Sequence, residues 1–206
     1  MVYEIFANHA HIFMPEVRED GTVDALLRLM DACGIDRCVG FAPFPSQAQG
    51  QNANQWLDRA TTAHRDRLIR FGTVDFERDD PEAQVREIHE LGFPGIKLHP
   101  AYQHFHLTGE KAMRVYREAE ARGLFLTFHT GIHWHRIRDY QVLLHDEIAY
   151  NFPKLRFSME HMGGYCFFHE ALAVLINNQR KEQRLYAGMT SVSAPESQRY
   201  WYLSDE

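Results

Sequence analysis

Hydrophobic positions along the 206-residue chain alternate between short β-rich runs and longer segments with helical spacing. Arg37–Phe41 and Leu124–His129 have the β-branched and aromatic content of buried strands. Thr22–Cys33 instead repeats apolar residues every three or four positions, and Gly34 follows it as a helix stop. The pattern therefore predicts repeated strand–helix units.

Seven such units can be followed. The predicted strands are Val2–His9, Arg37–Phe41, Leu68–Asp75, Gly95–His99, Leu124–His129, Leu155–His161 and Arg184–Thr190. The predicted helices cover residues 22–33, 52–63, 81–91, 108–122, 138–151 and 167–176. Strict alternation favours parallel strands joined by right-handed crossovers. About seven units, with no glycine-rich dinucleotide motif after the first strand, predict an α/β fold of the (β/α)8 TIM-barrel type that lacks the last strand.

The end of the chain leaves two interpretations open. A complete barrel usually takes about 250 residues, so we expect residues 1–206 to form a single, C-terminally incomplete domain whose natural chain continues past Glu206. Alternatively, Tyr200–Leu203 is a compressed last strand and Asp205 follows it, although Pro195–Glu206 fits the start of a helix equally well. A barrel left open at that edge is expected to form a homo-oligomer that covers it.

Composition narrows the class of protein. The chain is 45% hydrophobic and 24% charged, with a net charge of −6 and no block of lysine or arginine. Nucleic acid and anionic membranes are therefore poor partners, and a small-molecule substrate is expected. No apolar run approaches the roughly 20 residues of a membrane span. The three cysteines are sparse and odd in number, which favours reduced thiols and a cytoplasmic location.

Thirteen histidines are the compositional outlier, and several stand at strand ends. Because side chains alternate along a strand, we expect one residue set of each strand to share the barrel interior. The sets are Tyr3, Ile5, Ala7, His9 and His11; Gly95, Lys97 and His99; Phe125, Thr127 and His129; and Phe157, Met159 and His161. Histidines at the carboxyl ends of four strands point to a catalytic rim, where barrel enzymes place their active sites.

The pair His9 and His11 is the sharpest metal motif, since two imidazoles on one face of a strand can bind one cation. Lys97 is expected to hold an anionic substrate or a polar network; carbamylation between two metals and a purely structural role are its alternatives. His133 and His135 are expected to line a pocket or the surface. The histidines within predicted helices are expected on solvent or helix faces: His64, His89, His145 and His169.

Four segments carry a family resemblance: Asn-His-Ala-His-Ile-Phe from Asn8, Gly-Ile-Lys-Leu-His-Pro from Gly95, Phe-His-Thr-Gly from Phe128, and Glu-His-Met-Gly-Gly from Glu160. Together they resemble the amidohydrolase superfamily, in its branch with aminocarboxymuconate-semialdehyde decarboxylase and similar metal-dependent barrels. The resemblance implies that His9, His11 and His129 are metal ligands and that His161 handles protons beside the metal-bound water. The family's further aspartate ligand, at the end of the eighth strand, has no clear counterpart here; if Tyr200–Leu203 is the last strand, Asp205 is the candidate.

The resemblance implies a metal-dependent hydrolase in which a single divalent cation, with zinc favoured, activates water to cleave a C–N or C–O bond. Catalysis is assigned to His161 and Lys97. Rings and cations in the loops after the fourth and fifth strands suit a small carboxylated or aromatic substrate. Decarboxylation on the same site and a catalytically silent metal-binding barrel are the alternatives, whereas a metal-free sugar-phosphate barrel lacks its glycine-rich loop.

Overall fold

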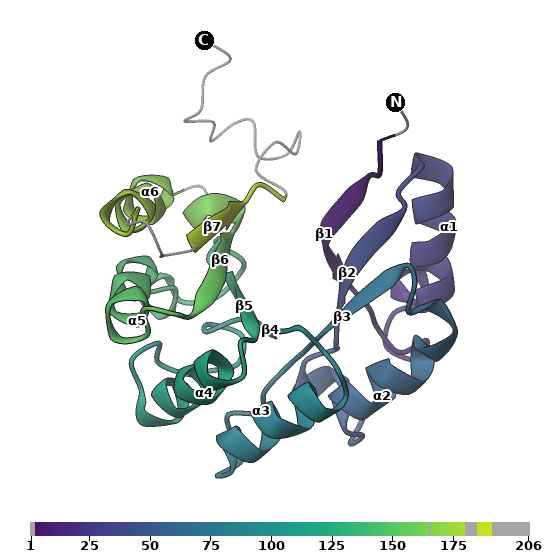
Figure 1. Ribbon diagram of the computed structural model, residues 1–206, viewed down its shortest axis with the longest axis horizontal. Helices are drawn as coiled ribbons and strands as arrows, with labels where there is room; N and C mark the ends of the chain where they lie inside the picture. The colour runs from purple at the N-terminus through teal and green to yellow at the C-terminus, as the bar shows by residue number, and fades with distance from the viewer. Residues whose placement is uncertain (1–2, 165, 180–184, 191–206) are drawn as a thin grey trace. The chain divides into compact units, whose positions relative to one another are not determined.

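The computed structural model describes residues 3–164, 166–179 and 185–190, and Asp205 and the segment Tyr200–Leu203 lie outside them (Figure 1). The chain divides into two compact units. The first comprises Met1–Asp75 and Ala83–Lys97, and the second comprises Phe76–Glu82 and Leu98–Glu206. Each unit is described separately below.

Parallel strands form the sheet of the first unit, each hydrogen-bonded to the next in sequence. The strands are β1 Phe6–His11, β2 Arg37–Phe41, β3 Leu68–Gly72 and β4 Gly95–Leu98, whose last residue falls in the second unit. The helices are α1 Val23–Cys33, α2 Ala53–Ala60 and α3 Pro81–Glu90. Short 3-10 turns cover Glu19–Gly21, Pro45–Gln47 and Thr62–His64.

Local capping explains where two of these helices begin and end. Thr22 accepts a hydrogen bond from the Ala25 amide at the start of α1, and Gly34 ends the helix in the left-handed conformation, with φ 65°. Asn52 caps α2 in the same manner. Asn54 then joins this helix to the end of β3, because its buried amide both donates to and accepts from the Thr73 backbone.

A β-bulge in β1 changes the predicted alternation. Ala7 pairs with Cys38 but His11 pairs with Phe41, so three steps along β1 match two along β2 before Ala10. Paired residues of neighbouring strands share a face, which puts Ala7 on the opposite face from His11. The prediction that the residues from Tyr3 to His11 alternate without interruption is therefore wrong, although His9 and His11 still lie together.

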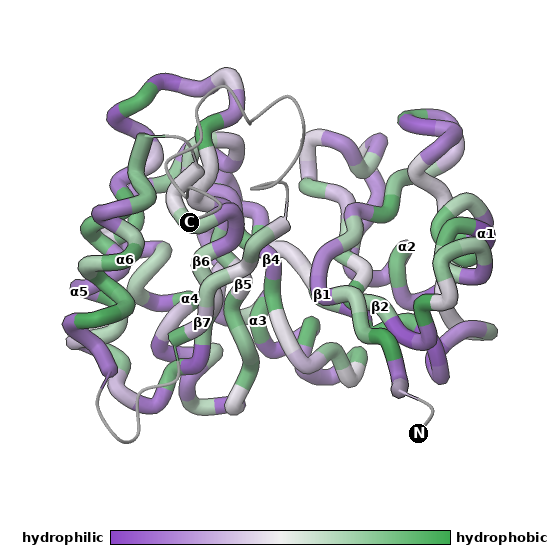
Figure 2. Tube along the Cα trace, turned by 90° about the horizontal axis from the view of Figure 1, so that it is seen from above, coloured by the Kyte–Doolittle hydropathy of each residue, from purple (hydrophilic) through white to green (hydrophobic). Residues whose placement is uncertain are grey.

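The second unit has three parallel strands, β5 Phe125–His129, β6 Arg156–Glu160 and β7 Leu185–Gly188. Helices α4 Glu110–Ala121, α5 His145–Asn151 and α6 Phe168–Asn177 line the same side of these strands (Figure 1). Figure 2 colours the chain by hydropathy, and both β5 and β6 contain hydrophobic positions. Their apolar residues Leu126, Phe128, Phe157 and Met159 are fully buried.

Two predicted helix starts are wrong. Gly109, rather than Thr108, is the residue that precedes α4. The Thr108 hydroxyl, which was expected to cap the helix, instead lies 3.0 Å from Nδ1 of His106. The segment expected to form one helix over residues 138–151 begins instead as two 3-10 turns, Ile137–Asp139 and Val142–Leu144. Gln141 interrupts it with a φ of 47°, so only the last two turns are α-helical.

His145 also corrects an expectation, since its side chain is fully buried rather than on a solvent or helix face. Its Nδ1–H donates to the Val142 carbonyl, and its ring meets the edge of Phe128 at a centroid distance of 4.9 Å. Burial lowers the pKa of His145 to about 4, against the weaker opposing effect of that hydrogen bond. The imidazole is therefore a neutral core residue.

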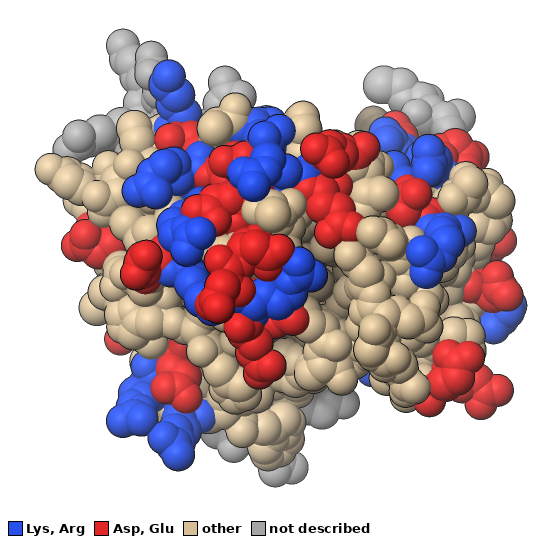
Figure 3. Space-filling model, turned by 90° about the horizontal axis from the view of Figure 1, so that it is seen from below, with Lys and Arg blue, Asp and Glu red and all other residues tan. Residues whose placement is uncertain are grey.

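On the face shown in Figure 3, acidic and basic side chains are interspersed. Several form ion pairs, including Arg114 with Glu82 and Lys111 with Asp79. Among the described residues, no helix is both long enough and apolar enough to cross a membrane.

Candidate active site

In the first unit, His9 and His11 form a strand-1 histidine pair over one aromatic ring. Their ring centroids lie 5.4 Å apart, and the Phe41 ring lies 4.7 Å from His9 and 5.2 Å from His11. Both imidazoles are half-buried. The register His11–Phe41 places both rings over the same aromatic side chain, so the two imidazoles lie on one side of the strand, as the H-x-H spacing predicts.

Lys97 lies on the same face of the first unit. It is fully buried, and its Nζ lies 4.8 Å from the centroid of the Phe41 ring, within the range of a cation–π contact. The ring that supports the histidine pair thus also holds the only lysine or arginine that is buried among the described residues. The predicted inward orientation of Lys97 is confirmed.

In the second unit, His129 lies on the predicted face of β5, but the residues of β6 do not lie on the faces predicted for them. Thr127 pairs with Ser158 and His129 pairs with Glu160, so Ser158 and Glu160 share the face of His129. Phe157 instead contacts Phe128 on the helix-covered face. The prediction that Phe157, Met159 and His161 line the interior is therefore wrong for the two strand residues.

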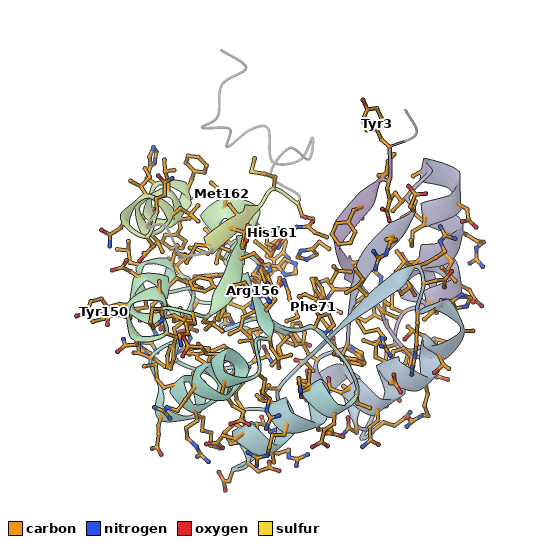
Figure 4. All side chains as sticks on the ribbon, in the orientation of Figure 1. Tyr3, Phe71, Tyr150, Arg156, His161 and Met162 are labelled. Carbon is orange, nitrogen blue, oxygen red and sulfur yellow. The ribbon has the colours of Figure 1, made fainter. Side chains whose placement is uncertain are left out.

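His161 nevertheless reaches the interior, because the chain leaves the strand there. Its φ is +67° and that of Met162 is +47°, a left-handed conformation that is uncommon outside glycine and is often found at functional sites. The Thr130 hydroxyl stabilises this turn, since it donates to the Glu160 carbonyl and accepts from the Gly163 amide. The turn brings the His161 ring to a centroid distance of 4.5 Å from His129. Figure 4 labels His161 together with its neighbour Met162 and with Arg156, the first residue of β6.

Close packing at Gly131 fixes the same ring. A Cβ atom at this position would lie 2.9 Å from Cβ and 3.2 Å from Cγ of His161. Thr130 and Gly131 belong to the Phe-His-Thr-Gly segment quoted for the resemblance, but no role is predicted for either of them from the sequence. No local pattern relates these residues to a histidine thirty positions away.

Backbone carbonyls set the tautomers of the two histidines, because a carbonyl oxygen can only accept. His161 donates from Nδ1 to Thr190, at 2.6 Å, so the lone pair of the neutral ring is on Nε2. His129 donates from Nε2 to Gly131, at 2.7 Å, so its lone pair is on Nδ1. Each ring therefore has one nitrogen oriented by the protein and one that carries the basic electron pair.

Three more rings lie next to the pair formed by His129 and His161. His99 stacks on His129 with centroids 3.8 Å apart, and its Nδ1 accepts a hydrogen bond from the Tyr102 amide, which favours the neutral ring. His135 meets both His99 and Tyr102 nearly edge-on. Burial lowers the pKa of His135, and the nearby His133 and His104 lower it further. His135 therefore lies beside the rings of His99 and Tyr102.

Glu160 is the residue that sequence reasoning missed. Only 1% of it is exposed, and no other aspartate or glutamate among the described residues is buried. Its carboxylate accepts a hydrogen bond from Ser158 at 2.6 Å. The signal was present in the Glu-His-Met-Gly-Gly segment, but the assumed alternation of β6 assigned Glu160 to the outer face.

The donor set fits a transition-metal cation. Imidazole nitrogen is a preferred ligand of zinc, copper, iron and nickel ions. Two imidazoles that bind one cation at about 2.0–2.1 Å hold their ring centroids about 5 Å apart, close to the 5.4 Å between His9 and His11. Within either unit, the described residues do not gather three His, Cys, Asp or Glu side chains around one point that could hold a metal ion.

Comparison with known proteins decides the family. The model of a family described as amidohydrolase matches residues 10–176, which is most of the chain. The chain belongs to the amidohydrolase family. The resemblance inferred from the four histidine-containing segments is thereby confirmed. Among curated proteins, no sequence matches the chain.

Solved structures show the fold of this amidohydrolase-family chain. An uncharacterized TIM-barrel protein from Bordetella bronchiseptica has a TM-score of 0.73 at 19% identity, covering 91% of this chain and 75% of that one. A probable 2-pyrone-4,6-dicarboxylic acid hydrolase from Acinetobacter baumannii has a TM-score of 0.69 at 13% identity, covering 96% and 76%. The predicted TIM-barrel fold is confirmed, and the seven described strands are the seven predicted.

A third similar structure holds ligands. The 5-carboxyvanillate decarboxylase from Novosphingobium aromaticivorans, complexed with manganese and 4-hydroxy-3-methoxy-5-nitrobenzoic acid, has a TM-score of 0.69 at 18% identity. The alignment covers 96% of this chain and 82% of the decarboxylase. At this identity the likeness shows the fold alone.

Proposed function

We propose that this chain is a metal-dependent hydrolase of the amidohydrolase type that acts on a small carboxylated or aromatic substrate. The observation that carries the proposal is the His161 imidazole, which donates from Nδ1 to Thr190 and contacts His129 through a left-handed turn. A ring whose tautomer is set by a backbone carbonyl and whose Nε2 carries the lone pair is suited to general base and acid catalysis.

His9, His11 and His129 would hold one divalent cation, with zinc favoured, and the cation would polarise the substrate carbonyl and acidify water. His161 would accept a proton from the attacking water at Nε2 and return it to the leaving nitrogen or oxygen. Its hydrogen bond to the Thr190 carbonyl becomes stronger when the ring is protonated, so this carbonyl stabilises the imidazolium form.

Lys97 would bind the substrate carboxylate. Its ammonium group is buried against Phe41, on the face that carries His9 and His11. A buried cation recognises an anionic group more strongly than an exposed one, because water screens the attraction less. The rings of His99, Tyr102 and His135 would contact the remainder of a planar substrate.

Decarboxylation is the second candidate, favoured by the structural likeness to the manganese-containing 5-carboxyvanillate decarboxylase and to a 2,6-dihydroxybenzoate decarboxylase from Rhizobium. In that reaction the bond from the ring carbon to the carboxylate breaks, carbon dioxide leaves, and His161 would deliver a proton to the ring carbon. Manganese rather than zinc would then be a suitable cation.

A substrate panel tests both candidates on the purified protein loaded with zinc or with manganese. Amides, lactones and hydroxylated benzoates are each incubated in water enriched in oxygen-18. Hydrolysis places the heavy isotope in the product carboxylate, whereas decarboxylation releases carbon dioxide and leaves the product unlabelled. Bound metal without turnover of any of these substrates would favour the catalytically silent barrel over both enzymes.

A further inference from the structure

Resting on the proposed function, we infer that Glu160 supplies the negative charge that raises the affinity of this site for its divalent cation. Glu160 is one residue before His161 and lies outside the set of ligands assigned above. It acts on the cation through its charge, and is therefore a positioning residue rather than a catalytic one.

The register of the second unit places this charge beside a proposed ligand. Glu160 pairs with His129 across β5 and β6, and paired residues of parallel strands project from the same face. Neighbouring strands lie about 4.7–4.9 Å apart. The carboxylate and the imidazole therefore project from adjacent points of one face.

The position is built to hold a carboxylate. Ser158 donates to Oε1 of Glu160 at 2.6 Å, and the Thr127 hydroxyl lies 3.4 Å from that of Ser158. On β7, Gly188 pairs with Glu160, and a Cβ atom there would lie 1.8 Å from Oε2. The Ser158 hydroxyl thus holds the carboxylate on one side, and the absence of a side chain at Gly188 leaves room for it on the other.

The negative charge of Glu160 would favour the binding of a cation at this site. Burying a carboxylate costs several kcal/mol unless opposite charge compensates it. The proposed ligands His9, His11 and His129 are neutral when they bind metal, so a divalent cation would bring two uncompensated charges into the site. A fixed carboxylate on the same face lowers that cost, because Coulomb attraction is stronger where water is excluded.

The test measures metal affinity and not turnover. Dissociation constants of Zn²⁺ and Mn²⁺ are determined by competition with a chromophoric chelator for the wild type and for Glu160→Gln, which removes the charge and keeps the shape. Glu160→Gln should weaken both affinities by about 10–100-fold, the usual effect of removing an outer partner of a metal site. Glu147→Gln, which removes an exposed carboxylate on α5, is the matched control and should leave both constants unchanged.

Thermal unfolding in a chelator separates this role from a structural ion pair. Without metal, Glu160→Gln should unfold at the same temperature as the wild type, because the amide keeps the shape of the side chain and an oxygen that can accept the Ser158 hydrogen bond. A lower unfolding temperature of the metal-free variant would show that Glu160 stabilises the fold and would overturn the inference. Equal metal affinity of variant and wild type would also overturn it.

Gly188→Ala provides an independent variant, since its methyl group displaces the carboxylate without removing it. It should weaken metal binding in the wild-type background and have no further effect in Glu160→Gln. Additive losses in the double variant would count against the inference. If the wild type binds neither Zn²⁺ nor Mn²⁺, the proposed function itself fails; if it binds them and Glu160→Gln binds equally well, only this inference fails.

Discussion

His9 and His11 lie two residues apart on β1 in the first unit, whereas His99, His129 and His161 belong to the second unit and lie at the ends of three different strands, β4, β5 and β6. The first pair needs only strand alternation and a shared support, the Phe41 ring. The second group needs the register of β5 and β6 and a left-handed turn that reorients His161. The comparison shows two means of converging imidazoles, one local and one that depends on distant backbone contacts.

The largest expected effect is the loss of bound metal when the histidine pair of the first unit is removed. Replacing His9 and His11 together by alanine should remove the divalent cation, because two of its three proposed ligands are lost from one strand. Metal content of the purified variant, measured by mass spectrometry of the elements, checks this. His133→Ala and His135→Ala together form a matched control with the same H-x-H spacing, and they should leave the metal in place. An unchanged metal content after loss of His9 and His11 would show that the site lies elsewhere.

His161→Ala tests the second unit and should lower turnover by about 10²–10⁴-fold, the usual contribution of a positioned acid–base group. Metal content should remain that of the wild type, because His161 is assigned to proton transfer and not to ligation. The measurement is kcat on whichever substrate the panel identifies, together with elemental analysis. Loss of metal as complete as in the variant without His9 and His11 would make His161 a ligand.

A fall in pH should lower the free energy of unfolding, because His145 in the second unit is buried in its neutral form. Its pKa is about 4 when folded and about 6.5 when unfolded. Below pH 6.5 the unfolded chain therefore binds a proton that the folded chain excludes, and stability is lost as the pH falls from about 6.5 to 4. The loss is on the order of 3 kcal/mol at the lower limit.

His145→Phe should abolish most of this pH dependence, which denaturant unfolding at pH 7 and pH 4.5 would measure. His89→Gln, an exposed histidine on α3, is the control and should change the free energy of unfolding by less than about 0.5 kcal/mol. An equally steep loss of stability in His145→Phe would show that other groups cause it.

The smallest effect is expected from Gly131→Ala. The added methyl group would lie 2.9 Å from Cβ of His161, so the ring must shift by a few tenths of an ångström. Displacement of a proton-transfer group by this amount should lower kcat about tenfold with little change in metal content. Gly109→Ala, at the start of α4, serves as the control. Unchanged kcat in Gly131→Ala would mean that the position of His161 is less critical than its tautomer.

Much of the fold followed from patterns that act over a few residues. The helix start at Thr22, its end at Gly34 and the strand Arg37–Phe41 were predicted where the structure has them. The His9–His11 pair was also predictable, because residues two apart on a strand share a face whatever surrounds them. Local geometry and side-chain period determine such features.

The tertiary structure alone decided the remainder. The side chain of Glu160 faces His129, and His161 reaches the same face, because strand register and a left-handed turn stabilised by Thr130 override simple alternation. His145 is buried because Phe128 and Phe157 cover it from other strands. Register, turn conformation and burial depend on partners more than ten positions away or on backbone dihedral angles, and the order of residues along one strand contains neither.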